Sequence, residues 1–342
     1  MTIIIVAIFS LSIWLFLLLF WGNFWRADCL LDKSQGLNDY PTVCAVVPAR
    51  NEAEVIAASL TSLLNQDYAG QFSVVLVDDN SGDYTTEIAL QTAAQLGKSD
   101  RLTVIAGKPL VTGWKGKLWA MHQGIESVSI PANTPDYWLF TDADIQHDLH
   151  NLTQLVTKAE TEDLDLVSLM VLLRCQSFWE KLLIPAFVFF FQKLYPFAWV
   201  NNPAKSMAAA AGGCVLISNE ALTKIGGIAS IKNALIDDCT LAQAVKSDGK
   251  NIYLGLSETT ISLRGYDNLK VIWDTIARTA YTQLNYSPLL LAGTVIGMVI
   301  IYLIAPIGMA WGLVTSNWLV FGICTVTWLL MIWAYLPTIK LY

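Results

Sequence analysis

Charged residues are scarce in this sequence. Only 14% of the 342 residues are charged and 54% are hydrophobic. Residues 2–25 contain no charge, and no charge occurs between Arg278 and Lys340. Such long uncharged stretches exclude an ordinary soluble protein and predict membrane segments.

Basic residues, cysteine pairs and histidines are also few. Lys and Arg total 21 against 28 acidic residues, a net charge of −7, which argues against a nucleic-acid partner. The six cysteines include no CxxC pair, so we expect neither a disulfide framework nor a zinc site. Two of the three histidines, His147 and His150, follow an acidic motif, where they either approach a metal or belong to a polar loop before a helix.

Three segments are long and apolar enough to span a bilayer. Residues 2–25 lack the basic n-region of a signal peptide and are too long for its apolar core, so we interpret them as a retained anchor. Residues 288–314 and 318–336 are joined by three polar residues, which predicts a transmembrane hairpin over 288–337. Arg26 and Lys340 flank these spans, and positive residues favour the cytoplasmic side.

Two further segments are typical of the membrane surface. Residues 177–200 are rich in aromatics but interrupted by Pro185 and Pro196. We judge them too short and too interrupted to span, and expect an interfacial segment, with a buried core helix as the alternative. Residues 267–286 predict an amphipathic helix on the membrane surface. Packing of this helix against a soluble domain remains the alternative.

Residues 38–266 are the one stretch with enough mixed polarity for a soluble domain. Short apolar runs alternate in it with segments of helical spacing. The expected strands are 43–47, 72–77, 102–105 and the run entering Asp142, and the expected helices are 52–64, 85–96 and 117–125. This alternation predicts an α/β fold with a mostly parallel sheet.

Polar groups follow three of these strands, at 48–52, at Asp78-Asp79, and at Asp142-Ala143-Asp144. Ligands of parallel sheets bind beyond the carboxyl ends of the strands. Two aspartates one residue apart project to one side if the backbone stays extended, and such oxygen ligands suit Mg²⁺ or Mn²⁺ bridging to substrate phosphates. Asp, Asn, Ser and Gly are also ordinary turn residues.

The motifs at these strand ends read VVPARNE, VLVDDNSGD and FTDAD. Together they resemble a family 2 glycosyltransferase with the GT-A fold. Its later landmarks are matched by Ala211-Gly212-Gly213-Cys214 and by Ile236-Asp237-Asp238-Cys239-Thr240-Leu241, where Asp237 replaces the usual Glu. GWKGKLWAMHQG (113–124) and ARTAYTQLNYSP (277–288) resemble the hopene-associated subgroup, which is similar in layout to ceramide glucosyltransferases. Of the Gln-x-x-Arg-Trp motif found in some relatives, only Arg278 matches.

The resemblance implies a role for each matching residue. Asp144 with Asp142 would hold Mg²⁺ or Mn²⁺, and Asp238 would be the catalytic base beside Asp237. The nucleotide-sugar would contact Pro48, Arg50, Glu52, Asp78, Asp79, Lys117 and Asp142. The acceptor would contact Gly212, Gly213, Cys214 and Arg278. Lys117 could equally be a solvated lysine at a helix start, and one aspartate of the 237–238 pair could cap a helix.

The resulting hypothesis is a membrane-bound inverting glycosyltransferase. It would move a sugar from a nucleotide-diphosphate donor, a UDP-sugar, to the hydroxyl of a hopanoid- or sphingolipid-like lipid. It would be a multi-pass protein of the bacterial inner membrane with the GT-A domain in the cytoplasm. The chain ends soon after the third span, where relatives tend to continue, so a C-terminally shortened chain stays open. The alternatives are a polyprenyl-phosphate glycosyltransferase or polysaccharide synthase, and an inactive GT-A membrane scaffold.

Overall fold

The computed structural model describes residues 1–31, 36–128, 134–266 and 268–342. They form two compact units. The sheet unit comprises Asp28–Cys175 and Trp199–Gly265, and the apolar unit comprises Met1–Ala27, Gln176–Ala198 and Tyr266–Tyr342.

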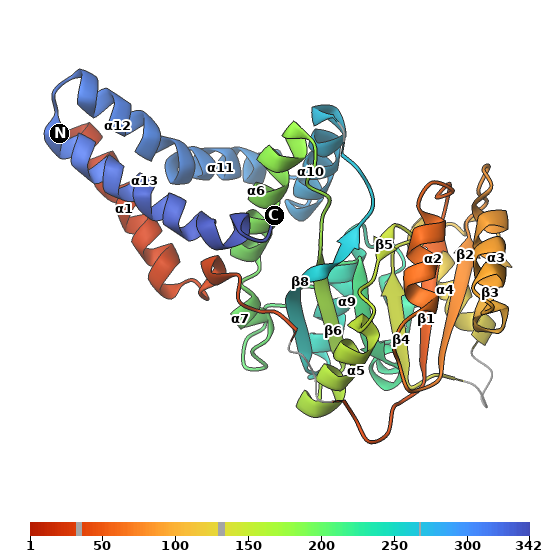
Figure 1. Cartoon of the computed structure of the whole chain (residues 1–342). Helices are drawn as coiled ribbons and strands as arrows, with labels where there is room; N and C mark the ends of the chain where they lie inside the picture. The colour runs from red at the N-terminus through yellow and green to blue at the C-terminus, as the bar shows by residue number, and fades with distance from the viewer. Residues whose placement is uncertain (32–35, 129–133, 267) are drawn as a thin grey trace. The chain divides into compact units, whose positions relative to one another are not determined.

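Within the described residues, the sheet unit contains one eight-stranded sheet of order β3-β2-β1-β4-β7-β6-β8-β5 (Figure 1). The strands are β1 (Val43–Ala49), β2 (Phe72–Asp78), β3 (Leu102–Ala106), β4 (Tyr137–Thr141), β5 (Ile145–Gln146), β6 (Leu166–Leu172), β7 (Cys214–Ser218) and β8 (Ile252–Ser262). β1 to β4 pair in parallel, and β7 runs antiparallel to both β4 and β6. The predicted α/β class and mostly parallel sheet are confirmed.

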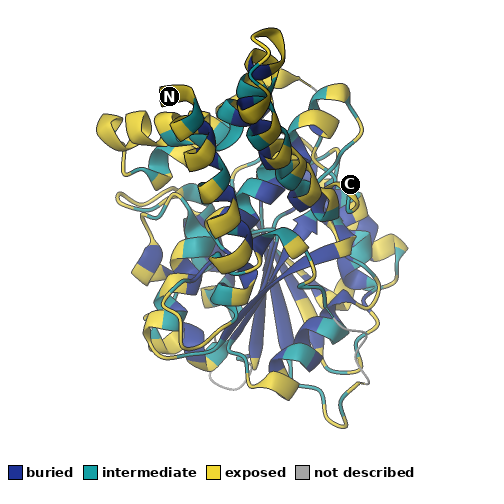
Figure 2. Cartoon of the chain, turned by 90° about the vertical axis from the view of Figure 1, so that its left-hand side faces the viewer, coloured by how far each residue is buried: buried dark blue, intermediate teal, exposed yellow. Residues whose placement is uncertain are grey.

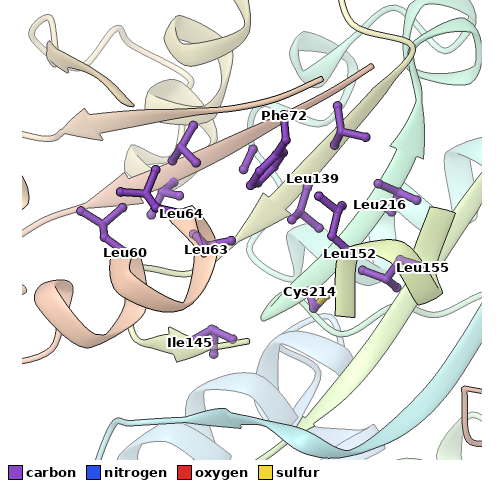
Figure 3. Packing of buried hydrophobic residues seen from close by; sticks show 14 of the residues in the cluster. Leu60, Leu63, Leu64, Phe72, Leu139, Ile145, Leu152, Leu155, Cys214 and Leu216 are labelled. Atoms are coloured by element: carbon purple, nitrogen blue, oxygen red, sulfur yellow. The ribbon is translucent and has the colours of Figure 1, made fainter. Parts of the chain in front are cut away.

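Helices cover both faces of this sheet. They are α2 (Ile56–Leu64), α3 (Thr85–Gln95), α4 (Gly116–Val128), α5 (Asn151–Glu162), α8 (Asn219–Lys224) and α9 (Asp237–Ser247). Alternate β1 residues Val43, Ala45 and Val47 join one core with residues of α2, α3 and α5. Figure 3 shows part of this core, with Leu60 of α2 and Leu152 of α5. The intervening Val46 faces α4, where it leaves no room for a Cβ at Gly124. The period-two alternation of strands therefore divides the apolar residues between two layers of helices.

The predicted helix at 52–64 begins later than expected, at Ile56. Asn51 has a left-handed φ of 55°, and Glu52 accepts from the amides of Val55 and Ile56 in a turn. This turn keeps the polar 50–52 segment out of the helix and at the end of β1. The sheet unit also begins earlier than the predicted residue 38, because Leu30 forms a parallel bridge to Leu256.

The apolar unit is helical. Its elements are α1 (Thr2–Phe20), α6 (Phe178–Leu194), α10 (Leu269–Gln283), α11 (Pro288–Met298), a π-helical turn (Val299–Leu303), α12 (Ile304–Val314) and α13 (Trp318–Ile339), and α7 (Phe197–Val200) straddles the boundary of the two units. In Figure 2 these helices are largely coloured as exposed, whereas the strands of the sheet are buried. Asp267, the first residue of the predicted amphipathic helix, lies outside the described residues.

Among the residues that the structure describes, four helices have the length and composition to cross a membrane: Thr2–Phe20, Phe178–Val200, Pro288–Val314 and Trp318–Ile339. The second differs from our expectation for 177–200, which we judged too interrupted to span. Pro185 is accommodated inside α6, and a capping box of Ser177 and Glu180 starts the helix. Residues Gln176–Ala198 also group with the apolar helices and not with the sheet.

Candidate active site

The polar segments after β1, β2 and β4 lie at one edge of the sheet, because these three strands pair in parallel register. The Asp79 amide donates to Ala49 O at 2.8 Å, which joins the ends of β1 and β2. The predicted convergence of these segments is therefore present.

The β2 loop is held by its own side chains. Asp78 accepts from the Ser81 amide (2.9 Å) and from Thr86 Oγ1 (2.8 Å), so both of its oxygens shape the loop. The neighbouring Asp79 Oδ2 lies 3.4 Å from Arg50 Nη1. Asp79 and Arg50 therefore form an ion pair beside the loop, whereas Asp78 is occupied within it.

The backbone does not stay extended through the DxD motif. β4 ends at Thr141, and Asp142 to Asp144 form a turn in which the Ile145 amide donates to Asp142 O at 3.3 Å. The two carboxylates consequently have different partners and do not form the simple same-side pair that an extended strand would give. Asp144 accepts from Ser262 Oγ (3.2 Å) and Arg264 Nε (3.1 Å).

Lys117, on the first turn of α4, connects Asp142 to the second acidic motif. Its Nζ lies 2.7 Å from Asp142 Oδ1 and 3.3 Å from Asp237 Oδ2. Burial alone would lower the pKa of Lys117, but the charges of Asp142 and Asp237 outweigh it and raise the pKa. Burial raises the pKa of Asp142, and Lys117 opposes this shift. The lysine is therefore a charged bridge between two carboxylates, with its side chain 35% exposed.

Asp238 is held by backbone amides. Its Oδ2 accepts from the Gly212 amide (2.8 Å) and its Oδ1 from the Cys239 amide (2.7 Å). Burial and the neighbouring Asp237 raise the pKa of Asp238 to about 6, against the opposing charge of Lys117. The cap residue of α9 is Ile236, without a side-chain cap bond, so neither aspartate occupies the capping position that we held open.

Gly212 leaves little room for a side chain where the turn approaches this cluster. A Cβ at Gly212 would stand 3.2 Å from Lys117 Nζ and 3.3 Å from Asp238 Oδ2. A cavity of about 20 Å³ lies beside them, enough for about one water molecule. Its lining includes Pro48, Lys117, Gly212, Asp237 and Asp238.

From the sequence, Arg264 was considered only as a basic residue for a lipid phosphate, and its pairing with acidic residues of this cluster was not predicted. It follows β8 and pairs with both Asp144 and Glu52, whose Oε1 lies 2.5 Å from its Nη2. Burial raises the pKa of Glu52, and Arg264 opposes the shift. A basic residue directly after a strand was the available signal, but that strand was not predicted.

The other two predicted acceptor residues lie in the core of the sheet unit and in the apolar unit. Cys214 is fully buried in the main core, so its side chain does not face an open site (Figure 3). Side chains alternate between the two faces of β7, and that of Cys214 points into the core. Arg278 lies on α10 of the apolar unit, and its role stays a prediction.

The carboxylates present fit a divalent ion of the kind predicted. Mg²⁺ is usually held by one or two carboxylates together with substrate phosphates, and Asp142 and Asp144 are two carboxylates at one strand end. Among the described residues no group of three or more His, Cys, Asp or Glu could hold a metal without a substrate. His147, the other metal candidate, is buried and bonded to Thr141 and Asn151.

Comparison with known proteins identifies the class of this fold. The structure is similar to that of mannosyltransferase PcManGT from Pyrobaculum calidifontis, solved with GDP-Man and Mn²⁺. The TM-score is 0.60 at 18% identity, over 99% of this chain and 97% of that one. The sheet unit therefore has the GT-A glycosyltransferase fold.

The family follows from the sequence profile of Glycosyl transferase family 2, which matches residues 44–226, more than half of the chain. The chain belongs to this family and is a glycosyltransferase. The predicted family, fold and enzyme class are confirmed.

Two curated relatives are similar over shorter stretches. Beta-monoglucosyldiacylglycerol synthase of Trichormus variabilis is 31% identical over 144 residues, 41% of this chain and 29% of that protein. Probable glycosyltransferase YdaM of Bacillus subtilis is 31% identical over 91 residues, 26% of this chain and 21% of that protein. The chain thus matches less than a third of the length of these relatives.

Proposed function

We propose that this chain transfers a sugar from a nucleotide-diphosphate sugar to the hydroxyl of a membrane lipid, with inversion at the anomeric carbon. The observation that carries the proposal is the Asp142–Lys117–Asp237 bridge. It joins the strand end expected to hold the donor to the carboxylate pair expected to activate the acceptor. A donor and an acceptor bound on either side of the bridge would meet at Asp238.

Asp238 acts as the general base in this proposal. Its carboxylate takes the proton of the lipid hydroxyl while that oxygen attacks the anomeric carbon and the bond to the diphosphate breaks. A pKa of about 6 leaves the carboxylate ionised at neutral pH yet basic enough to accept the proton. The two amide donors hold it in one orientation.

The donor is bound by the segments after β1, β2 and β4. Asp79 and Arg50 would meet the nucleoside, with Pro48 and Glu52 beside them, and the Lys117 ammonium would meet the diphosphate or the sugar. A Mg²⁺ or Mn²⁺ ion bound through Asp144 and Asp142 would neutralise charge on the departing diphosphate. Arg264 holds Asp144 in place by its ion pair. A UDP-sugar is the donor that we favour.

The lipid acceptor is supported by two independent features. Four helices of the described part of the chain are long and apolar enough to span a membrane, and one relative is a beta-monoglucosyldiacylglycerol synthase. A diglyceride hydroxyl therefore joins the hopanoid and ceramide hydroxyls as a candidate acceptor. We propose a multi-pass protein of the bacterial plasma membrane with the GT-A domain facing the cytoplasm, where nucleotide-sugars are found.

The test is a transfer assay on the full chain in lipid nanodiscs with Mn²⁺. Labelled UDP- and GDP-sugars would be offered with a hopanoid, diacylglycerol, ceramide or polyprenyl phosphate in parallel, and Asp238→Asn would serve as the matched inactive control. We expect label in a hydroxyl lipid with the parent only. Label confined to polyprenyl phosphate, or to a water-soluble glycan, would contradict the acceptor class. Donor binding without transfer to any acceptor would favour the inactive scaffold.

A further inference from the structure

A buried polar network lies beneath the active site. Thr141, His147 and Asn151 are only 1%, 5% and 2% exposed. Thr141 ends β4, His147 follows β5, and Asn151 begins α5. Buried polar side chains are costly unless they are hydrogen-bonded, so this group needs a reason for its presence inside the core.

The available protons determine how the network is bonded. Thr141 Oγ1 lies 2.9 Å from both Gly213 O and His147 Nε2. A hydroxyl has one proton, and the carbonyl can only accept it. His147 Nε2 must therefore carry a proton and donate to Thr141. His147 Nδ1 is then an acceptor, and the Asn151 amide nitrogen donates to it at 3.0 Å. This arrangement satisfies every group with a neutral His147, and burial lowers the pKa of His147 to about 4.

The end point of this chain of bonds is the turn that orients the catalytic base. Gly213 O accepts from Thr141, and the preceding Gly212 amide donates to Asp238 Oδ2 at 2.8 Å. Ser168 on β6 is fully buried and contacts the same turn. Its Oγ accepts from the Ala211 amide at 2.9 Å. Thr141 is also the residue directly before Asp142.

We propose that His147 and Thr141 are positioning residues, which lock the Gly212–Gly213 turn against the end of β4 and so aim Asp238 at the acceptor. His147 touches no substrate and acts only through Thr141. The catalytic consequence rests on the proposed role of Asp238 as base, whereas the locking of the turn does not. A displacement of about 1 Å at a reacting group lowers rates by up to about 10²-fold.

Kinetics of matched threonine variants test the catalytic part. Thr141→Val keeps the shape and removes the hydroxyl, and Thr141→Ser restores the hydroxyl. We expect Thr141→Val to lower kcat by about 10- to 100-fold with the donor KM within about threefold of the parent, and Thr141→Ser to recover most of kcat. The control is Thr157→Val, since the buried Thr157 hydroxyl has no hydrogen-bond partner among the described residues; it should leave kcat unchanged. An unchanged kcat in Thr141→Val, or an equal loss in Thr141→Ser, would overturn the proposal. A rise in donor KM that accounts for the whole loss would instead assign Thr141 to donor binding.

Two measurements test the lock without any turnover. Hydrogen exchange of the Gly212 amide, which donates to Asp238, should speed up at least tenfold in Thr141→Val and not in Thr141→Ser or Thr157→Val. Nitrogen NMR of ¹⁵N-histidine protein, assigned with His122→Gln and His150→Gln because the chain has three histidines, should show His147 neutral and protonated at Nε2 at pH 6. A protonated Nδ1 or a cationic ring at that pH would contradict the network. If the parent transfers no sugar in the nanodisc assay, the proposed function fails, but these two measurements still decide whether the lock exists.

Discussion

The two units of this protein differ in how far their apolar residues are buried. In the sheet unit, strand residues such as Val46, Leu76 and Leu139 are at most 1% exposed, and the charged groups gather at the strand ends. In the apolar unit, Leu289 is 82% and Val314 is 85% exposed. Only 6% of the residues in the most apolar part of Pro288–Val314 are buried. Exposed apolar area of this extent is not tolerated in water. The contrast is compatible with a membrane around the second unit, and the charged side chains of the candidate active site lie in the first.

The largest expected effect is the loss of donor binding in Asp144→Asn. Asp144 is one of the two carboxylates proposed to bind the divalent ion, and it pairs with Arg264. We expect metal-dependent binding of the nucleotide-sugar and transfer both to disappear, as measured by calorimetry with and without Mn²⁺. The exposed Asp100→Asn is the control and should bind normally. Undiminished metal-dependent binding in Asp144→Asn would remove the metal role of this carboxylate.

Asp238→Asn should separate binding from chemistry in the same unit. An asparagine keeps the shape of the side chain but cannot accept the proton, so turnover should fall about 10²-fold or more while donor affinity is kept. Single-turnover rates and donor titration measure the two quantities. Turnover within a few-fold of the parent would mean that another group is the base, and Asp237 would be examined next.

A matched pair of lysine substitutions tests the difference in solvent directly. Ile296 on α11 and Leu90 on α3 are similarly exposed, 60% and 51%. If lipid surrounds Ile296, a lysine in its place opposes membrane insertion by up to about 3 kcal/mol. Leu90→Lys should change stability by less than about 0.5 kcal/mol. Glycosylation mapping of insertion and thermal unfolding measure the two effects. Normal insertion of Ile296→Lys would show that this face of α11 does not contact the bilayer core.

The smallest expected effect is a pH dependence set by Asp238. Because its pKa is raised to about 6, transfer should fall about tenfold per pH unit below this value, as the base becomes protonated. The Asp238 carboxyl also binds its proton more tightly in the folded protein than in the unfolded chain, where its pKa is 3.8. The stability contributed by the proton is present below pH 3.8 and is lost as the pH rises through about 6.

Asp238→Asn should consequently raise the melting temperature at pH 8 relative to the parent and give no such gain near pH 4. A pH-rate profile and thermal unfolding at both pH values check these expectations. If the remaining activity of the variant still falls at acid pH, another group is responsible for the titration. The same conclusion would follow if the variant gained as much stability at pH 4 as at pH 8.

The sequence by itself determined the local pattern of this protein. The period of the apolar residues is a local property, so it predicted β1 to β4 and the helices between them, and the uncharged runs predicted the spans at both ends. The strand-end motifs predicted that acidic groups would meet at one edge of the sheet, because parallel strands share that edge.

Only the tertiary structure decided which charges and polar groups meet. Lys117 reaches Asp237 across 120 residues of chain, and Arg264 reaches Glu52 across 212. The turn at Asp142–Asp144, which gives the two carboxylates different partners, depends on contacts with β8 that come late in the chain. The bonds of His147 depend on a turn before β7, an antiparallel strand inserted between β4 and β6. Such pairings are set by the folded positions of distant strands, and no local spacing of residues encodes them.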